Sequence, residues 1–487
     1  MKKTRFFLFY LVISLFSWSC ESPVEPNPDN TDDTQPEVTL TDPGAPRSSD
    51  YLYDVQTLSE IKLSVSLNDW NEFLTNYDLD TRNNVYVPAT FTYSKDGDTF
   101  MIDSVGIRLR GNTSRRRPEG NGGEMHTANQ TDWHHVHFQV KFDEYKNKVT
   151  FCGSDRVILK WHKDDGAYCR EVYSYDLFRR FGVWTAPRAT YTRMSVHVEG
   201  DDRPAYFGVY VLVEGVNDSF LKNRKEAGLF KSKNGNLWKA AWGANLSPSS
   251  MNANNMGISI ATVDNNVNFI YDLKTNKKTG LTAACTQLQR FVADMNALAD
   301  GSTALKNFLE ERVAVDQFLR AYAVNVMVGM WDDYWYNTNN YYFYFDEDNK
   351  FYFIPFDYDN TLGTSCIMEN SGTQNLLNWG SLDNDRVLMR KVMSITDYKE
   401  RYKAYIKDLA DSNNDYFDAN KSIARITAWH QMIAPYITND TGEDMSINDV
   451  PASWGNCSFY RVLTGNEQGG SNGNANWFKT KIKSINF

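Results

Sequence analysis

Apolar and polar residues alternate through much of the first half of the chain, and this period of two predicts β-strands. One hairpin is expected to turn at residues 201–204. A single helix interrupts the strands at about residues 166–181, and Gly182 follows it as a C-cap residue. The expected strands cover residues 61–65, 105–110, 137–142, 194–199 and 208–214.

In the second half of the chain, apolar residues recur three and four positions apart, which predicts helices. One such stripe runs through residues 315–326, and residues 386–437 predict two or three further helices. A β-rich segment, residues 341–354, lies between these helical blocks. Strands followed by helices indicate an α+β fold.

Two pairs of aspartates flank this β-rich segment. Asp332 and Asp333 precede it, and Asp357 and Asp359 follow it. Because a hairpin brings its two ends together, we expect these four carboxylates and Asn340 in one small region. Such close carboxylates repel unless a cation joins them, and oxygen ligands without His or Cys suit Mg²⁺ or Mn²⁺. Protein kinases combine an aspartate loop, an asparagine and a metal-binding aspartate in a similar way. The alternative is a solvated turn capped by these side chains.

The N-terminus carries an export pattern. Lys2, Lys3 and Arg5 precede an apolar run at residues 6–16 that is too short to span a bilayer, which predicts a signal peptide. The run ends among small residues at Cys20, which we expect to receive a lipid anchor, so residues 1–20 form the leader. The alternative is an ordinary secretory signal with an incidental cysteine.

Residues 21–50 are rich in Pro, Asp, Glu, Thr and Ser, so we expect an extended, disordered tether. The acidic residues behind the anchor cysteine resemble the surface-export signals of Bacteroidetes lipoproteins, which implies an outer-membrane lipoprotein of the cell envelope that faces outward. The net charge of −10 argues against nucleic-acid partners and against membrane contact other than through the anchor. Cys152 and Cys169 are expected either to form a disulfide or to pack as small buried hydrophobic residues.

Several segments match a known family in order. Residues 340–344 read Asn-Tyr-Tyr-Phe-Tyr, and residues 353–363 read Phe-Ile-Pro-Phe-Asp-Tyr-Asp-Asn-Thr-Leu-Gly. With these, the chain over roughly residues 51–363 resembles the spore coat protein H (CotH) kinase family. It departs from ordinary kinases because it has no His-Arg-Asp or Asp-Phe-Gly. Further matching segments lie at residues 106–114, 207–214, 228–231 and 271–276.

The resemblance implies a divergent two-lobed protein-kinase-like fold over residues 51–487. A β-rich smaller lobe would cover about residues 51–235, and a mainly helical larger lobe would cover about residues 236–487. The implied activity is transfer of phosphate from ATP to protein hydroxyls with Mg²⁺ or Mn²⁺. The implied partners are therefore ATP and a protein substrate.

The resemblance also implies roles for the aspartate loops. Asp332 would be the catalytic aspartate, with Asp333 as the alternative because the two acids are adjacent. The metal would be held by Asn340 with Asp357 or Asp359.

Five further residues are implied to bind the cofactor. Lys141 would be the phosphate-binding lysine and Glu171 its ion-pair partner; both residue types are also common on solvated strands and helices. The matching upstream segments contribute Arg110, Glu214 and Lys231. The arginine-rich loop at residues 111–123 is expected either to cradle phosphates or to be a solvated basic loop.

Two other functional classes stay open on the sequence. A surface adhesin or structural module with the same fold would need no turnover, and the scarcity of ATP outside the cell favours it. A glycan hydrolase would use two of the clustered carboxylates as acid and nucleophile, with 28 Tyr and 13 Trp available as sugar platforms.

Overall fold

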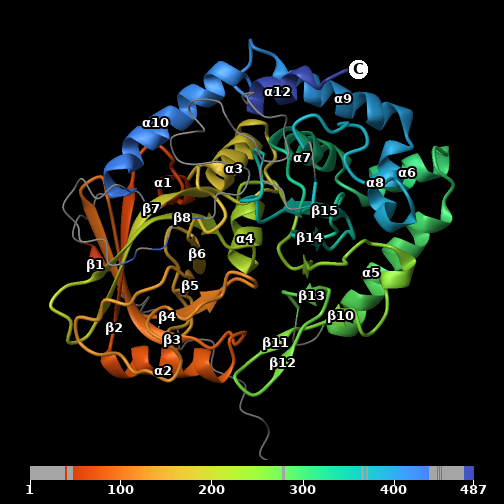
Figure 1. Ribbon diagram of the computed structural model, residues 1–487. Coiled ribbons are helices and arrows are strands. Elements are labelled where there is room, and N and C mark those ends of the chain that lie inside the picture. Colours follow the sequence, from red (N-terminus) through yellow and green to blue (C-terminus); the bar gives the residue numbers. More distant parts are fainter. Residues whose placement is uncertain are drawn as a thin grey trace, which may run out of the picture. The chain divides into compact units, whose positions relative to one another are not determined.

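In the computed structural model, a β-barrel and a smaller helix-covered sheet organise the chain (Figure 1). The chain from Val38 to Phe487 forms one compact unit. Cys20, the expected signal peptide and most of the expected tether lie outside the described residues. The structure describes residues 39–40, 48–276, 280–363, 367–368, 371–437, 447, 449, 451 and 477–487.

Seven strands of the described chain close into the barrel, in the order β4-β3-β2-β7-β8-β6-β5 and back to β4. Only β2 and β7 run parallel; the other neighbours are antiparallel. A short strand, β1 (Thr39–Leu40), pairs with β4 outside the ring. The barrel strands are β2 (Ser59–Val65), β3 (Val87–Lys95), β4 (Asp98–Arg110), β5 (His137–Lys141), β6 (Arg156–Lys160), β7 (Ala189–Val198) and β8 (Ala205–Glu214).

The barrel closes because the long strand β4 reaches both edges of the sheet. Gly106 lies opposite Pro88 of β3 and also opposite Lys141 of β5. A Cβ at this position would come within 2.7 Å of the Cβ of Glu144, so only glycine fits without a shift. Between Ala89 and Phe91 of β3 the facing segment of β4 carries one extra residue, and this bulge adds the local bend that closure needs.

This closure corrects the expected fold. The chain is α+β as predicted, but the prediction of a divergent two-lobed protein-kinase-like fold is wrong, because the strand-rich part is a closed barrel and not a β-rich smaller lobe. The alternating pattern fixed which face of each strand is buried, whereas closure depends on pairing between strands far apart in the chain. The barrel core combines aliphatic side chains with a group of aromatic rings in mutual contact, which includes Phe91, Tyr93, Phe100, Phe142 and Phe151.

The strands of the second sheet come from two parts of the chain, residues 236–273 and 341–355, which three helices separate in the sequence. Their order in the sheet is β10-β13-β9-β14-β15. Its edge pair β10 and β13 is parallel, and the other pairs are antiparallel. A separate two-stranded ribbon is formed by β11 (Ile260–Ala261) and β12 (Asn266–Val267). The sheet strands are β9 (Asn236–Ala240), β10 (Met256–Gly257), β13 (Tyr271–Leu273), β14 (Tyr341–Phe345) and β15 (Phe351–Pro355).

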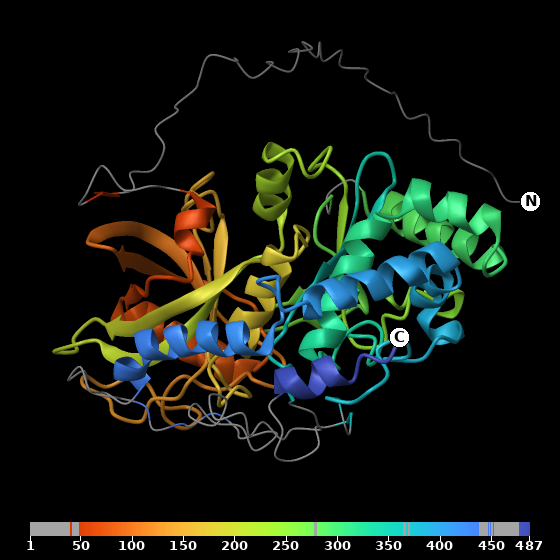
Figure 2. The same ribbon diagram turned by 90° about the horizontal axis from the view of Figure 1, so that it is seen from above.

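Helices connect and cover the two sheets. The expected helix near residues 166–181 is α3, and the expected stripe at residues 315–326 is α7. In Figure 2, α10 runs from the barrel toward α12, and it contacts β8 as well as α12. The helices are α1 (Ser49–Leu52), α2 (Leu67–Leu79), α3 (Arg170–Arg180), α4 (Asp218–Glu226), α5 (Leu281–Ala297), α6 (Thr303–Arg312), α7 (Val315–Val328), α8 (Val387–Met393), α9 (Thr396–Ala410), α10 (Ala419–Ile437) and α12 (Trp477–Lys483), with 3₁₀ turns η1 (Pro248–Ser250) and η2 (Asn384–Arg386).

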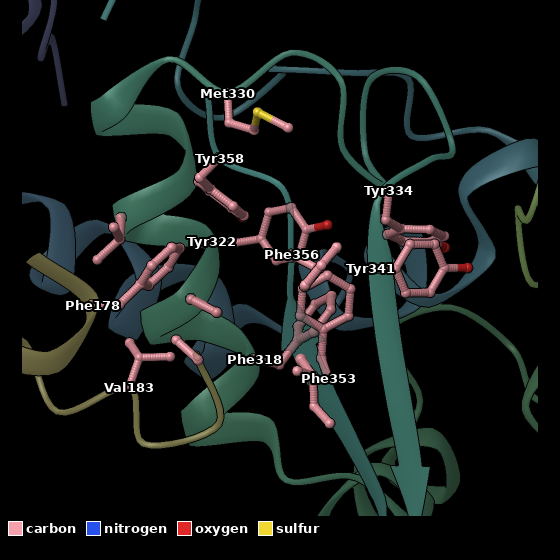
Figure 3. Packing of buried hydrophobic residues seen from close by; sticks show 14 of the residues in the cluster. Phe178, Val183, Phe318, Tyr322, Met330, Tyr334, Tyr341, Phe353, Phe356 and Tyr358 are labelled. Atoms are coloured by element: carbon pink, nitrogen blue, oxygen red, sulfur yellow. The ribbon is translucent and has the colours of Figure 1, made fainter. Parts of the chain in front are cut away.

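The β14–β15 hairpin is fixed by an aromatic core against α7 and α3. Phe318 and Tyr322 of α7 point at Phe353 of β15, with ring centroids 5.5 and 5.3 Å from it (Figure 3). Phe178 of α3 meets the ring of Tyr358, just after the hairpin, edge to face at 4.8 Å. These contacts hold β15 against α7 and the loop that follows it against α3.

One expectation on a pair of residues is also settled by position. Cys152 is buried in the barrel core and Cys169 in the core of the helical region, so both pack as small hydrophobic residues and the proposed bridge between them is not formed. Within the described part of the chain, none of the helices combines the length and apolar content that a membrane crossing requires.

We expect acid to destabilise the protein through His430 of α10. This side chain is 3% exposed, and burial lowers its pKa from 6.5 to about 4, although Nε2 lies 2.7 Å from the carbonyl oxygen of Ala167. Between these two values only the unfolded chain takes up the proton. The free energy of unfolding should therefore fall as the pH is lowered from about 6.5 toward 4, by about 3 kcal/mol from this group.

Urea unfolding of the wild type and of His430→Gln at pH 7 and pH 4.5 measures this effect. Glutamine can still donate to Ala167 but does not titrate in this range. The stability gap between wild type and variant should therefore shrink, or change sign, at the lower pH. A gap that is the same at both pH values would contradict the prediction.

Candidate functional site

A buried lysine at the end of β6 is surrounded by three carboxylates. Lys160 Nζ lies 2.8 Å from Glu171 Oε2, 2.5 Å from Asp357 Oδ1 and 3.1 Å from Asp359 Oδ2. The lysine side chain is 7% exposed, and that of Glu171 is 3% exposed. We call these four residues the lysine cluster. It joins the barrel, α3 and the loop after the β14–β15 hairpin at one point.

Helix α3 positions the cluster through two side chains on one face. Glu171 lies in its first turn, and Tyr175 follows four residues later. The backbone N–H of Asp357 donates to Tyr175 Oη at 3.0 Å. Arg170, fully buried, donates to the carbonyl oxygen of Thr361 at 2.8 Å and so ties the start of α3 to the same loop.

The charges of the lysine cluster do not balance, and this shows in its pKa values. Burial alone would lower the pKa of Lys160, but Asp357, Asp359 and Glu171 together raise it well above its usual value. Burial raises the pKa of Asp359 and of Glu171, and Lys160 only partly offsets this. For Asp357, burial acts in the same direction, but Lys160, Arg110 and Lys239 together outweigh it and lower the pKa. One ammonium facing three carboxylates leaves two negative charges in excess when all are ionised.

Asp332 lies at the other side of the hairpin end, and three asparagine amides hold its carboxylate. Oδ1 accepts from Asn337 at 2.6 Å and from Asn339 at 3.0 Å, and Oδ2 accepts from Asn340 at 2.8 Å. Burial raises the pKa of Asp332, the three amides oppose this shift, and nearby Asp357 adds to it. The side chain is half-buried, so its oxygens reach the surface of the site in a fixed orientation.

Asp333 faces the interior instead. It is 2% exposed, and its carboxylate accepts from Asn325 of α7 and from the backbone N–H of Tyr336, both at 2.8 Å. Burial raises the pKa of Asp333 to about 7, despite these hydrogen bonds. Of the two adjacent aspartates, only Asp332 is placed to meet a molecule bound at the surface.

The expected antiparallel pairing of the hairpin is confirmed. Tyr341 lies opposite Pro355, so Asn340 and Asp357 come from neighbouring chain ends. Both have left-handed backbones, with φ of 50° and 68°, a conformation that Asn and Asp tolerate better than most residues. The local backbone therefore turns both side chains away from the regular strand direction and toward the site.

The expectation that Lys141 pairs with Glu171 is wrong. In the antiparallel β5–β6 pair, Lys141 lies opposite Arg156, at the far end of β6 from Lys160. Four strand positions separate the two ends, about 13 Å. Lys141 Nζ instead contacts Glu144 at 2.7 Å.

The other predicted cofactor-binding residues are spread over the molecule. Glu214 is buried in a two-point ion pair with Arg224 of α4, with both N···O distances 2.8 Å, and lies opposite Val157, whereas Lys160 lies opposite Val211. Lys231 is 75% exposed and pairs with Asp348. Arg110 lies with its guanidinium 5.5 Å from the ring centroid of Phe356, next to the site.

Sequence reasoning missed Lys160 and two of the asparagines that hold Asp332. A usable signal for Lys160 was its place at the end of the apolar strand Arg156–Lys160, where a buried lysine needs a counter-charge. For Asn337 and Asn339, the signal was the group of amide side chains at residues 337–340, between the aspartate pair and the predicted strand. Only proximity in the fold distinguishes these residues from ordinary surface lysines and asparagines.

The donor set of the site fits a hard divalent cation. Asp357, Asp359 and Asn340 offer carboxylate and amide oxygens, which suit Mg²⁺ or Mn²⁺, and the excess charge of the lysine cluster matches one dication. Across the described ranges, no three His, Cys, Asp or Glu side chains are arranged as a ready metal centre. In the lysine cluster the carboxylates converge on an ammonium group.

A small pocket gives access to the lysine cluster from the barrel side. It is lined by Glu171 and Asp359 together with Trp161 and Val211, and by the acidic segment 164–165. The pocket therefore combines two apolar walls with the charged groups of the site.

Fold and site together define an α+β protein in which a buried lysine–carboxylate cluster faces an aspartate held by amides. The sequence matches the family described as CotH kinase protein over residues 107–467, about three quarters of the chain. The chain therefore belongs to the CotH kinase protein family. No curated protein gives a significant match to it.

Proposed function

We propose that the protein is an exported lipoprotein that transfers phosphate from ATP to hydroxyl groups of a protein substrate. The observation that carries this proposal is the pairing of the lysine cluster with an oriented aspartate: Lys160 with its carboxylates on one side, and Asp332 on the other. Membership of the CotH kinase protein family supports it. Phosphoryl transfer needs chiefly positive charge near the phosphate and a group that orients the attacking hydroxyl. Lys160 would supply the first and Asp332 the second.

Lys160 would bind phosphate oxygens of ATP with the donors that Asp357 and Asp359 release when these two carboxylates turn to the metal, while Glu171, at 2.8 Å, keeps the third donor and the direction of the ammonium. Asp357, Asp359 and Asn340 would hold Mg²⁺ or Mn²⁺, which supplies positive charge to the phosphate oxygens.

Asp332 would accept the proton of the substrate hydroxyl. Its two oxygens are fixed by three amide donors, at 2.6 to 3.0 Å, which leaves lone pairs for the acceptor hydroxyl in a defined direction. Its raised pKa makes it a better proton acceptor than an exposed aspartate. The amides thus orient the base, and burial adjusts its strength.

Incubation of the compact unit, from Val38 to Phe487, with labelled ATP and Mg²⁺ or Mn²⁺ tests the proposal. We expect autophosphorylation or transfer to an added protein, and a metal-dependent rise of the melting temperature with ATP. If neither is seen with either metal, the phosphotransferase proposal fails. A surface adhesin or structural module would then be the better description.

The proposed location is the outer membrane, facing outward and attached only through the lipid on Cys20. Cys20→Ala removes the thiol that carries the lipid, so we expect the protein to move from the membrane fraction to the soluble fraction. Fractionation followed by immunoblotting measures this. Cys20 should also be the first residue of the mature wild-type chain by mass spectrometry. Unchanged membrane partitioning, or a different mature N-terminus, would contradict the lipid anchor.

A further inference from the structure

Three arginines crowd the end of β4 without a carboxylate partner. Arg108 and Arg110 both donate to Gln139 Oε1 at 3.0 Å. Arg108 and Arg115 both donate to Asn84 Oδ1 at 2.5 Å. In the described part of the chain, none of the three forms a salt bridge. Their hydrogen bonds go to neutral amide and carbonyl oxygens, so their charges act on Asp357 and Asp80 only through space.

Lys239 on β9 faces the same region from the second sheet. It lies directly opposite Tyr342 on β14, so the two side chains share one face of the sheet. Tyr342 contacts the ring of Phe356 at 5.0 Å, and the Arg110 guanidinium lies over that ring. Burial and the charge of Arg110 lower the pKa of Lys239 to about 8. No salt bridge of Lys239 is found among the described residues either.

Nearby carboxylates are already engaged. Asp272, opposite Lys239 on β13, pairs with Lys274, and Asp357 pairs with Lys160. The next arginine in the loop behaves differently from Arg115: Arg116 Nη1 lies 2.8 Å from Asp449 Oδ2.

Arg117, one residue further along, also has a carboxylate partner, because its Nε lies 3.0 Å from Asp78 Oδ1. In a chain of net charge −10, carboxylates are not scarce. The four cations nevertheless have no direct carboxylate partner, and Asp357 and Asp272 offset only part of the repulsion that lowers the pKa of Lys239, so an added anion would stabilise them further.

We propose that Arg108, Arg110, Arg115 and Lys239 form a binding site for clustered phosphate groups beside Asp357. Guanidinium forks bind phosphate oxygens in pairs, and several cations side by side match several phosphates better than one carboxylate. All four side chains are half-buried, so they are both fixed and accessible. We call them the cationic cluster.

The phosphates can come from two sources: the tail of a nucleotide or a phosphorylated segment of a protein substrate. In the first case the inference rests on the proposed function, because the nucleotide would extend from Lys160 to Arg110. The first probe is therefore inorganic tripolyphosphate, because its binding can be measured without metal and without phosphate transfer.

Isothermal titration of tripolyphosphate into the metal-free protein measures binding directly. We expect Arg110→Gln and Lys239→Met each to weaken binding at least tenfold, and higher salt to weaken wild-type binding. Arg179→Gln and Lys222→Met remove the same charges from side chains that are each 55% exposed, and should bind as the wild type does. Equal binding by all five proteins, or none by the wild type, overturns the proposal.

A second readout separates a binding role from a structural one. Lys239→Met relieves repulsion in the cationic cluster, so its ligand-free melting temperature should equal or exceed that of the wild type. A lower melting temperature would show that Lys239 supports the fold, and would overturn its role here.

Titrations with ATP and with a peptide carrying two adjacent phosphoserines identify the source, since only the true source should lose affinity in Arg110→Gln. Tripolyphosphate binding that depends on Arg110, in a protein that transfers no phosphate, would refute the proposed function and leave the cationic cluster standing.

Discussion

Asp332→Asn is expected to reduce phosphoryl transfer by about 10²- to 10⁴-fold while ATP and metal still bind. Asn337 and Asn339 are not among the proposed binding groups, and the third amide, that of the proposed metal ligand Asn340, can still donate to the side-chain oxygen of an asparagine at position 332, so the binding groups should keep their positions. Asparagine has nearly the same volume as aspartate, but its amide cannot act as a base that takes the proton from the substrate hydroxyl. Single-turnover transfer of labelled phosphate measures the first effect, and titration with ATP and Mn²⁺ measures the second.

Asp333→Asn provides the contrast. Its carboxylate is buried and accepts hydrogen bonds from Asn325 and from the backbone of Tyr336. This variant should therefore lower the melting temperature and have little effect on phosphoryl transfer by the folded protein. The assignment would reverse if Asp333→Asn lost transfer at an unchanged melting temperature while Asp332→Asn kept it. An Asp332→Asn protein that no longer bound ATP would place this residue in binding and not in proton transfer.

Lys160→Met is expected to lower the free energy of unfolding by about 3 kcal/mol, because it leaves three carboxylates together without a cation. The value is at the low end for a broken buried pair, since the Asp357 side chain is 35% exposed and water screens part of the repulsion. Mg²⁺ or Mn²⁺ should restore much of this loss, and more strongly than they stabilise the wild type. Urea unfolding with and without the metal gives both quantities.

Lys222→Met is the matched control, because it removes a lysine with a long, exposed contact to Glu226, 3.8 Å. Its stability should change little, with or without metal. A Lys160→Met protein as stable as the wild type would mean that the three carboxylates bind protons instead of sharing one charge. Destabilisation that no divalent cation reverses would argue against a metal site at Asp357 and Asp359.

Sequence alone placed the elements of this protein well where local pattern decides them. The alternation in residues 61–65 and 208–214 corresponds to β2 and β8, and the stripe at residues 315–326 corresponds to α7. The hairpin with its two aspartate loops was also predictable, because an antiparallel pair must bring Asn340 and Asp357 together. Side-chain periodicity and turn chemistry are short-range properties, so the sequence states them directly.

Tertiary structure decided which strands meet and which charges pair. Barrel closure depends on β4 reaching β5 as well as β3, and no local pattern encodes that choice. Lys160 and Lys141 both follow apolar strand residues, yet only the antiparallel register of β5 and β6 brings Lys160 to Glu171. Electrostatic interactions act across space, between residues up to 199 positions apart in this site, so the fold alone selects the partners.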